Sequence, residues 1–542
     1  MIAGFIPFSL KQEPNTLPES SGFEGRFQDG IYWDERTFSS YNLGGINGTY
    51  RFNHNKPEWN TLQFVASASE VIIQNDPLGI STLYYRETER GLWFCSDPLI
   101  LGAISGIRAS IDFEALGQYW MLTNPFGNVV PLSGVSKLGP GAKLKISGSG
   151  ITILESPWTP DYANTRSGSF DAFCDDVIHS MTSLAGGRKI SVGLSGGLDS
   201  RVLLALLMKS GAPFQCHVHG PEDEPDVIIS KAVAETAGAE HHYIDDSNPR
   251  GPLMIDYIKR YSGASFGCRV AWDAATLRVF EQLAEQNVVL IDGGYGEICR
   301  RHLMNRIWYS PVGRMALYRN DISRILPFMM APKQAIFSTE IHSLMQRDLH
   351  GGLEQAWMNA RSLKLPSMED TLDLFVMHHR MHHLAGPVQR LLDETLPSTM
   401  PLADPAALQN VFTMPLRQRR RSRMFREIIH RFAPELEQHP LAQGTATVPY
   451  HYGFVRNKLA ARLSKRSGPG ASKASELLNQ QKDWVTELVN SKSAKDSGIY
   501  DMKELQKRCD EFYAGNSAHA AWLDQWLSFE CFRRQTTGES LS

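Results

Sequence analysis

The six residues SGGLDS at positions 195–200 bring two serine hydroxyls, two glycines and one carboxylate into a single short stretch. Before it, the apolar residues of 190–194 alternate along the chain, which predicts a β-strand. After it, residues 199–210 carry apolar side chains at helical spacing, and Gly211 and Pro213 predict the end of that helix. A glycine-rich turn at a helix N-terminus offers backbone N–H groups and the positive end of the helix dipole to an anion. The stretch therefore predicts an anion-binding site.

Other uses of such a turn have recognisable patterns. A Walker A loop needs the lysine of GxxxxGK[ST] and a dinucleotide-binding turn needs GxGxxG, and the sequence at 193–200 has neither. The residues GLSGG at 193–197 do satisfy GxSxG, the nucleophile elbow of α/β-hydrolases, but that interpretation leaves Asp199 and Ser200 without a role. A tight turn with an Asp or Ser helix cap, and no ligand, is the purely structural alternative.

The elements around this turn alternate between strands and helices. The residues FQCHVHG (214–220), EHHYID (240–245) and NVVLIDGG (287–294) predict further strands, and EPDVIISKAVAETAG (224–238) predicts a helix. Such alternation indicates a parallel sheet with right-handed crossovers, whose ligands bind at the carboxyl ends of the strands. SGGLDS and DGGYGE (292–297) both follow strands, so we expect them to face one site. From about residue 300 the pattern is mainly helical, with a flexible interruption at 464–475.

The first part of the chain has a different pattern. Residues 1–146 contain short alternating runs separated by glycine and Asn/Asp turns, which is typical of a sheet-rich domain. Residues 147–169 are rich in Ser, Pro and Gly and are interpreted as a linker. We therefore expect two domains, at 1–155 and 170–542.

Composition excludes several classes of protein. A formal charge of −3 over 542 residues provides no basic footprint for nucleic acid or an anionic membrane, so we expect neither as a partner. The seven cysteines form no CxxC pair, which favours reduced thiols in a cytoplasm over disulfides or zinc. The first residues lack a secretory signal, and no apolar run approaches the ~20 residues of a membrane helix. A cytoplasmic protein without a membrane span is expected.

The hexapeptide SGGLDS resembles the pyrophosphate loop of the ATP-pyrophosphatase superfamily, whose members bind ATP–Mg²⁺ and adenylate a substrate. The resemblance implies that Asp199 holds Mg²⁺, which prefers carboxylate and phosphate oxygens. It also implies a set of further ATP-binding residues, which contact the phosphates or the adenine: Leu194, Ser195, Gly196, Gly197, Ser200, Val218 and Gly294.

Further segments resemble asparagine synthetases in the same order along the chain. They are QNDPLGISTLYY (74–85), GLWFCSDPLILGAI (91–104), VSKLGPGAKLKI (135–146), residues 217–245 ending in HHYID, and the segment 400–436 that starts with MPLAD. The implied fold is α/β and α+β: an N-terminal sandwich like that of Ntn hydrolases (a glutaminase-like domain), then a C-terminal parallel-sheet ATP-pyrophosphatase domain (adenine nucleotide alpha hydrolase-like) with extra helices.

Departures from that family narrow the expectation. Its chains begin with a cysteine that attacks glutamine, whereas here Met1 is followed by Ile2 and the first cysteine is Cys95. We therefore expect a glutaminase-like domain that has lost its nucleophile. β-Lactam synthetases and lasso peptide cyclases share that loss, and both activate a carboxylate as an acyl-adenylate that an amine of the same molecule attacks.

The second loop departs as well. When Glu297 is aligned with the glutamate of the family's SGxGxDE loop, Gly296 stands where a second magnesium-binding Asp belongs, and Asp292 is the candidate replacement. Asp292, Tyr295 and Glu297 are the candidate catalytic residues, and Asp199 and Asp292 the candidate metal ligands. The family's late lysine has no counterpart in LAQGTATVPYHYGF (441–454).

The resemblance is closest to lasso cyclases, which close a macrolactam (isopeptide) ring in a ribosomally made peptide and release AMP and pyrophosphate. It implies ATP and Mg²⁺ as cofactors, a linear core peptide as substrate and a leader peptidase as partner. A small-molecule amide ligase and a non-catalytic peptide-binding relative stay open as alternatives.

Two further motifs each allow two interpretations. The run VMHHRMHH (376–383) places histidines at i, i+4, which suits a metal, but a face lining the cleft or packing on the core is favoured because no HExxH glutamate lies between them. The run RQRRRSRMFR (417–426) suits either a solvated helix face or contacts with phosphate or an acidic substrate.

Overall fold

The computed structural model describes residues 3–541 with gaps. The residues outside it are 1–2, 8–24, 29–30, 35–47, 53–55, 58, 68–69, 90, 107–108, 123–124, 164–169, 250, 302–303, 444–445, 452–469 and 542. Met1 and Ile2, on which the expected loss of the nucleophile was based, are among them.

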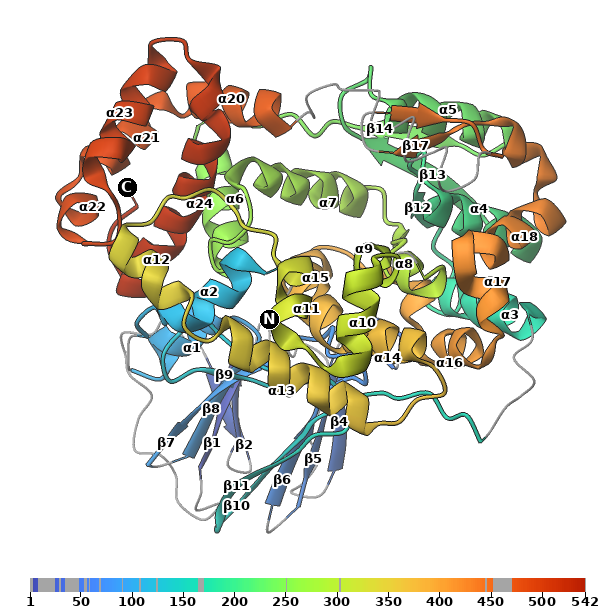
Figure 1. Ribbon diagram of the computed structural model, residues 1–542, viewed down its shortest axis with the longest axis horizontal. Coiled ribbons are helices and arrows are strands. Elements are labelled where there is room, and N and C mark those ends of the chain that lie inside the picture. The colour runs from blue at the N-terminus through green and yellow to red at the C-terminus, as the bar shows by residue number, and fades with distance from the viewer. Residues whose placement is uncertain are drawn as a thin grey trace.

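Two antiparallel sheets make up most of the N-terminal part (Figure 1). One runs in the order β1 (Ala3–Pro7), β8 (Gly91–Cys95), β7 (Tyr84–Thr88), β9 (Ser136–Lys137). The other runs β11 (Gly150–Leu154), β10 (Lys143–Ser147), β6 (Glu70–Gln74), β5 (Leu62–Ala66), β4 (Gly48–Phe52). β2 (Gly25–Gln28) and β3 (Ile31–Asp34) form a separate pair. Phe64 and Phe94, one from each large sheet, lie 5.3 Å apart in a shared apolar core.

This packing confirms the predicted sheet-rich sandwich. The predicted linker at 147–169 is wrong in its first part, because β11 pairs with β10 along its whole length. The strand was missed because Ser and Gly dominate 147–150, whereas the apolar residues Ile151 and Ile153 follow them.

The parallel sheet has the order β14 (His241–Ile244), β13 (Phe214–His219), β12 (Ile190–Gly193), β15 (Val289–Ile291), β16 (Ser398–Thr399). All four neighbouring pairs are parallel, as predicted. β16 was not predicted, because two residues that follow a long helical region carry no strand periodicity. The helices α3 (Phe170–Thr182), α4 (Leu198–Ser210), α5 (Pro225–Thr236) and α7 (Thr276–Glu285) belong to this half.

The rest of the described chain is mainly helical, as predicted. Its longer helices are α6 (Pro252–Ala264), α10 (Pro311–Arg319), α11 (Ile322–Met329), α12 (Thr339–Met345), α13 (Leu349–Ser362), α14 (Met368–Val376), α15 (His382–Asp393), α16 (Pro405–Thr413), α18 (Arg423–Phe432), α20 (Gly470–Gln480), α21 (Lys482–Asn490), α23 (Met502–Tyr513) and α24 (Ala520–Thr537). Shorter elements are α8 (Gly296–Cys299), α9 (Asn305–Trp308), α17 (Leu416–Arg419) and α22 (Lys492–Asp496), the π-helical turn Met377–Met381 and the hairpin β17 (Leu441–Gln443) and β18 (Ala446–Val448). The interruption predicted at 464–475 is wrong from Gly470 onward, where α20 begins.

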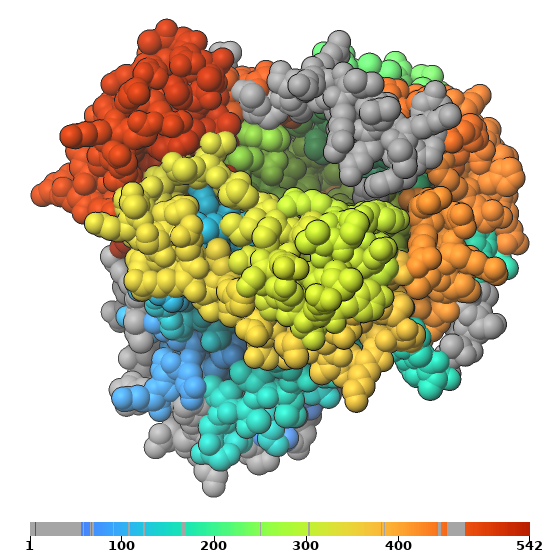
Figure 2. All heavy atoms as spheres, viewed as in Figure 1, coloured from blue at the N-terminus to red at the C-terminus, as the bar shows by residue number. Residues whose placement is uncertain are grey.

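A single large core joins the two halves. The helices α1 (Pro98–Ile104) and α2 (Phe113–Met121) follow the first sheet; α1 packs against α6 and α24, and α2 packs against α12. Figure 2 shows a hollow on one face, bordered by the red C-terminal helices and the yellow to yellow-green helices. Its visible floor is green, the colour of the segment that follows α4. Among the described residues, no helix has the length and apolar character to cross a bilayer.

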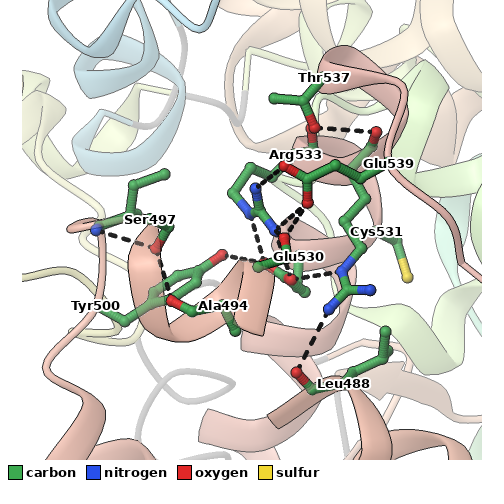
Figure 3. Close-up of polar contacts among 12 residues, drawn as sticks. Leu488, Ala494, Ser497, Tyr500, Glu530, Cys531, Arg533, Thr537 and Glu539 are labelled. Carbon is green, nitrogen blue, oxygen red and sulfur yellow. Dashed lines mark hydrogen bonds and ion pairs between the residues drawn. The ribbon is translucent and has the colours of Figure 1, made fainter. Parts of the chain in front are cut away.

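A buried ionic cluster holds the C-terminal helices together (Figure 3). Glu530 is fully buried on α24 and accepts hydrogen bonds from the Tyr500 hydroxyl (2.8 Å) and from the guanidinium groups of Arg533 and Arg534 (2.7 Å each). Arg533 also contacts Glu539, beyond the end of α24. A buried carboxylate needs such partners because burial without them is costly.

Candidate functional site

The SGGLDS loop connects β12 to α4 at the carboxyl edge of the parallel sheet. The chain continues from β12 to β13 on one side, while β15 pairs with β12 on the other. This is a topological switch point, where ligands of such sheets bind. The loop after β15, DGGYGE, begins at the same edge, so the fold brings the two predicted loops together.

The N-terminus of α4 carries no side-chain cap. Gly197 is the N-cap residue in an extended conformation, and no side chain accepts from the first-turn amides there. Those amides and the helix dipole favour an anion. Gly196 is required by close packing, because a Cβ at that position would lie 2.7 Å from the Cβ of Ala442.

Three amides of the loop itself already have partners. The Ser195 N–H donates to Oγ of Ser200 (3.1 Å), and the Gly197 N–H donates to Oγ of Ser195 (3.1 Å). The Gly196 N–H donates to Oδ1 of Asp226 on α5 (2.8 Å). A carboxylate therefore stands at the point of the loop where the sequence predicts a phosphate.

Asp199, the predicted metal ligand, lies in the first turn of α4 and forms an ion pair with Arg300. The Nε of Arg300 lies 2.7 Å from Oδ1 of Asp199, and its Nη2 donates to Oδ2 at 2.9 Å. Burial raises the pKa of the Asp199 carboxyl, and Arg300 opposes the rise. Gly296 packs directly against it, since a Cβ there would lie 2.4 Å from Cγ of Asp199. The position where the resemblance implies a second carboxylate therefore has no space for one.

Asp292 follows β15 and is exposed, and its Oδ1 accepts from the Gly294 N–H at 2.6 Å. Desolvation by the surrounding protein raises the pKa of its carboxyl, while the hydrogen bond from the Gly294 N–H opposes the rise. Gly294 packs against Met400, since a Cβ placed on Gly294 would lie 2.7 Å from the Met400 sulfur. Glu297 is half-buried at the start of α8, with Oε1 3.7 Å from Nε of Arg380.

Tyr295, a candidate catalytic residue, lies in the main apolar core. Its backbone adopts a left-handed conformation (φ 70°), and its side chain is fully buried, with the hydroxyl lacking a hydrogen-bond partner. Burial raises the pKa of the phenol far above its usual range. The turn directs this residue into the core, which the alternation of glycines in DGGYGE does not reveal.

Leu194 and Val218, the predicted adenine contacts, are 1% and 6% exposed. Leu194 belongs to the main core, and its amide donates to the His217 carbonyl on β13 (2.8 Å). These two side chains therefore present little open surface to an adenine ring.

Arg201 follows the loop and was missed as a structural residue. It is fully buried and donates to the carbonyls of Leu436 (3.1 Å), His439 (2.9 Å) and Pro440 (2.7 Å). These bonds hold β17 beside the loop, where the Ala442 amide donates to the Gly196 carbonyl (2.9 Å). An arginine directly after SGGLDS was visible in the sequence, but only the fold shows that it binds carbonyls rather than phosphate. Part of the segment searched for the late lysine, 444–445 and 452–454, lies outside the described residues.

The histidine run confirms the interpretation as a buried face. His378 contacts the Trp158 carbonyl (2.7 Å), and His383 contacts the Gly127 carbonyl (2.8 Å) and the Tyr119 hydroxyl (2.7 Å). Burial lowers the pKa of each of these two histidines, which keeps them neutral. They fasten α15 and the preceding π-helical turn to the N-terminal half.

The arginine run is solvated in part, as one of its two interpretations predicts, because Arg417, Arg420, Arg421 and Arg423 are exposed. Arg419 is fully buried and pairs with Asp370 and Asp373 on α14, and Arg420 pairs with Glu369 on the same helix. Arg301 pairs with Glu369 and Asp373 as well. Arg301 and Arg419 are buried in this ionic network, whereas Arg420 joins it from the surface with a side chain that is 46% exposed.

The chemistry of the donors fits Mg²⁺ at Asp199. Mg²⁺ is usually held by one or two carboxylates together with substrate phosphates and waters. Within the described part of the chain, no group of three or more His, Cys, Asp or Glu side chains is placed to hold a metal by itself. Asp199 and Asp292 share Glu297 as a neighbouring charge, but no described contact joins the two.

All seven cysteines are free and buried. Cys95, the first in the sequence, is fully buried, and burial raises the pKa of its thiol to about 12. A thiol of this kind is a poor nucleophile at neutral pH because the reactive form is the thiolate.

Comparisons with known proteins agree with this geometry. Residues 179–294, which include the SGGLDS loop and the first three residues of the DGGYGE loop, match the family described as asparagine synthase. The glutamine-hydrolysing asparagine synthetase of Bos taurus is 30% identical over 131 residues, 23% of this chain and 20% of that protein. That of Gallus gallus is 26% identical over 254 residues, 45% of this chain and 44% of that protein. In both cases the matched segment spans less than half of the relative's length.

Residues 179–294 therefore match an asparagine synthase domain, and the chain has weak similarity to asparagine synthetases. The mixed architecture, with one parallel and two large antiparallel sheets, is consistent with an ATP-pyrophosphatase fold of the asparagine synthase type. A solved structure of NMN synthetase from Francisella tularensis covers 40% of this chain and 96% of that chain at 17% identity, but its TM-score of 0.21 is too low to support an argument.

Proposed function

We propose that this protein is an ATP-dependent, AMP-forming amide ligase that closes a linear peptide into a macrolactam, as lasso peptide cyclases do. The observation that supports the ligase part is the SGGLDS loop at the switch point of the parallel sheet, with Asp199 in the first turn of α4. The match to the asparagine synthase family covers this loop and the first three residues of the loop after β15.

The chain's own residues suit adenylation. The uncapped N-terminus of α4 stabilises the negative charge of the β- and γ-phosphates, and Asp199 holds Mg²⁺. When bound, Mg²⁺ neutralises phosphate charge. A side-chain carboxylate of the peptide attacks the α-phosphorus, and pyrophosphate leaves. The peptide's α-amine then attacks the acyl carbon, and AMP leaves with the electrons of the broken C–O bond. Glu297, half-buried at the same edge, accepts the proton of the amine.

The choice of a peptide amine over glutamine rests on the cysteines. A glutaminase needs a nucleophilic cysteine, and each of the seven here is buried. An amine within the substrate removes the need for ammonia, and an intramolecular attack gains the entropic advantage of proximity. The floor of the hollow in Figure 2 has the green colour of the segment that follows α4, and the linear peptide of this proposal would bind in that hollow. A partner leader peptidase, which would supply the leader-free peptide, belongs to the same proposal.

Intact-mass spectrometry of a leader-free candidate peptide, incubated with the protein and ATP–Mg²⁺, tests the proposal. Loss of one water from the peptide with stoichiometric AMP is the expected result. Asp199→Ala should abolish both products, whereas Arg324→Gln, which removes an exposed arginine on α11, should change neither. Activity that survives Asp199→Ala would contradict the assignment of the loop.

Two alternatives correspond to other outcomes. AMP without a change in the peptide would identify a small-molecule amide ligase. A non-catalytic peptide-binding relative is favoured by one observation, the ion pair that engages both oxygens of Asp199. Peptide binding without AMP would identify that relative.

A further inference from the structure

Arg300 stands at the candidate phosphate site, beside a loop whose sequence contains no cation of its own. It follows α8, and its side chain is 20% exposed, like the 21% of its partner Asp199. The next residue, Arg301, has a left-handed backbone (φ 50°), and its side chain is buried in the ionic network with α14. Two adjacent arginines therefore serve different parts of the molecule, and only Arg300 contacts the SGGLDS loop.

The guanidinium of Arg300 has capacity for another anion. Its contacts with Asp199 use Nε and Nη2, whereas a guanidinium carries five N–H donors in a planar fork. That fork matches the oxygens of phosphate as well as those of carboxylate.

The close packing of Gly296 against Asp199 explains why Asp199 is paired with Arg300 and not with a second carboxylate. Because a Cβ at 296 would lie 2.4 Å from Cγ and 2.7 Å from Oδ2 of Asp199, the chain has no space for a second carboxylate at that point. A cation occupies the neighbourhood instead. A triphosphate that reaches the N-terminus of α4 thus meets Asp199 paired with a guanidinium, rather than Asp199 paired with a second carboxylate at position 296.

We propose that Arg300 is a polyphosphate-binding residue of this site: it neutralises Asp199 in the nucleotide-free protein and transfers to phosphate oxygens when ATP or pyrophosphate binds. The inference rests on the proposed function. A carboxylate at position 296 would help to hold a metal ion that neutralises phosphate charge. Because that carboxylate is missing, the inference assigns part of this neutralising role to Arg300.

Isothermal titration of the full-length protein with inorganic pyrophosphate, with Mg²⁺ and with EDTA, tests this role. Arg300→Gln should weaken pyrophosphate binding at least about tenfold in both conditions, and Arg300→Lys should recover part of the loss. Arg324→Gln, the matched control on α11, should bind as the wild type does. Unchanged or tighter binding by Arg300→Gln would overturn the proposal, because it would show that the arginine only occupies Asp199.

A second comparison covers the case in which Arg300→Gln fails to fold because Asp199 loses its partner. Asp199→Asn removes the competing carboxylate, so it should tighten pyrophosphate binding in EDTA, and the double variant Asp199→Asn/Arg300→Gln should lose that gain. Equal affinity of the single and double variants would refute the role of Arg300. If the wild type binds neither pyrophosphate nor ATP, the proposed function fails together with this inference. If the wild type binds pyrophosphate and Arg300→Gln binds it with equal affinity, only the role of Arg300 is refuted.

Discussion

Asp226 offers the sharpest test of how the SGGLDS loop binds an anion. Its carboxylate accepts the Gly196 N–H at 2.8 Å, so pyrophosphate must displace it before that amide can contact a phosphate oxygen. We predict that Asp226→Asn strengthens pyrophosphate binding, because the neutral amide competes less for the N–H and no longer repels the ligand.

The magnitude follows from the strength of this hydrogen bond. A hydrogen bond to a charged group contributes about 1.5–3 kcal/mol, against about 0.5–1.5 kcal/mol for a neutral one. The difference of about 1–1.5 kcal/mol, with the lost repulsion in the same direction, predicts binding tighter by at least about fivefold to tenfold. Asp226→Asn also removes an acidic residue from the first turn of α5. This change lowers the stability of the folded protein by about 0.3–1 kcal/mol but does not itself weaken contacts with pyrophosphate.

Titration calorimetry with pyrophosphate in EDTA measures the effect. Asp223→Asn is the matched control, since Asp223 is an exposed carboxylate on the same segment and its removal changes the net charge equally. If Asp226→Asn binds more weakly than the wild type, the carboxylate supports the loop's shape, and the reasoning that makes it a competitor is wrong.

Three other predictions concern packing and pH. Gly296→Ala should displace Asp199 from Arg300, since its Cβ would lie 2.4 Å from Cγ of Asp199; we expect a loss of about 1–3 kcal/mol in unfolding free energy by urea titration, with AMP formation reduced, and normal values for both would contradict the contact. Glu530→Gln should lose about 3–5 kcal/mol in the same titration, because it leaves buried arginine charges uncompensated, whereas Glu539→Gln, at a carboxylate 36% exposed, should lose less than about 1 kcal/mol; equal losses would refute the burial argument. Burial raises the pKa of Asp524 from 3.8 to about 8, so the folded protein holds this proton more tightly than the unfolded chain; the resulting stabilisation is complete below pH 3.8 and is lost as the pH rises to about 8. Asp524→Asn should flatten the fall in melting temperature across that window, and parallel melting curves of variant and wild type would exclude the effect.

Much of the nucleotide-binding half could be predicted from local sequence. The alternation of 190–194 and the helical spacing after 198 were enough for β12 and α4, and the recurrence of such pairs was enough for a parallel sheet, because strand and helix periods differ and each must bury one face. The two loops meet because parallel strands end at the same edge. β16 escaped prediction because its two residues carry no period of their own and are defined only by pairing with β15.

The chemical types available at the site are a property of the sequence: a loop of serines and glycines, a carboxylate in the next turn, and glycine at 296. Which of those groups face one another depends on contacts between residues far apart in the chain. Asp199 meets Arg300 and the Gly196 amide meets Asp226, across separations of 101 and 30 residues. Tyr295 and Arg201 have the chemistry of site residues and are buried by the fold. Periodicity constrains only neighbours along one element, whereas these assignments depend on side-chain packing between elements, which tertiary structure alone decides.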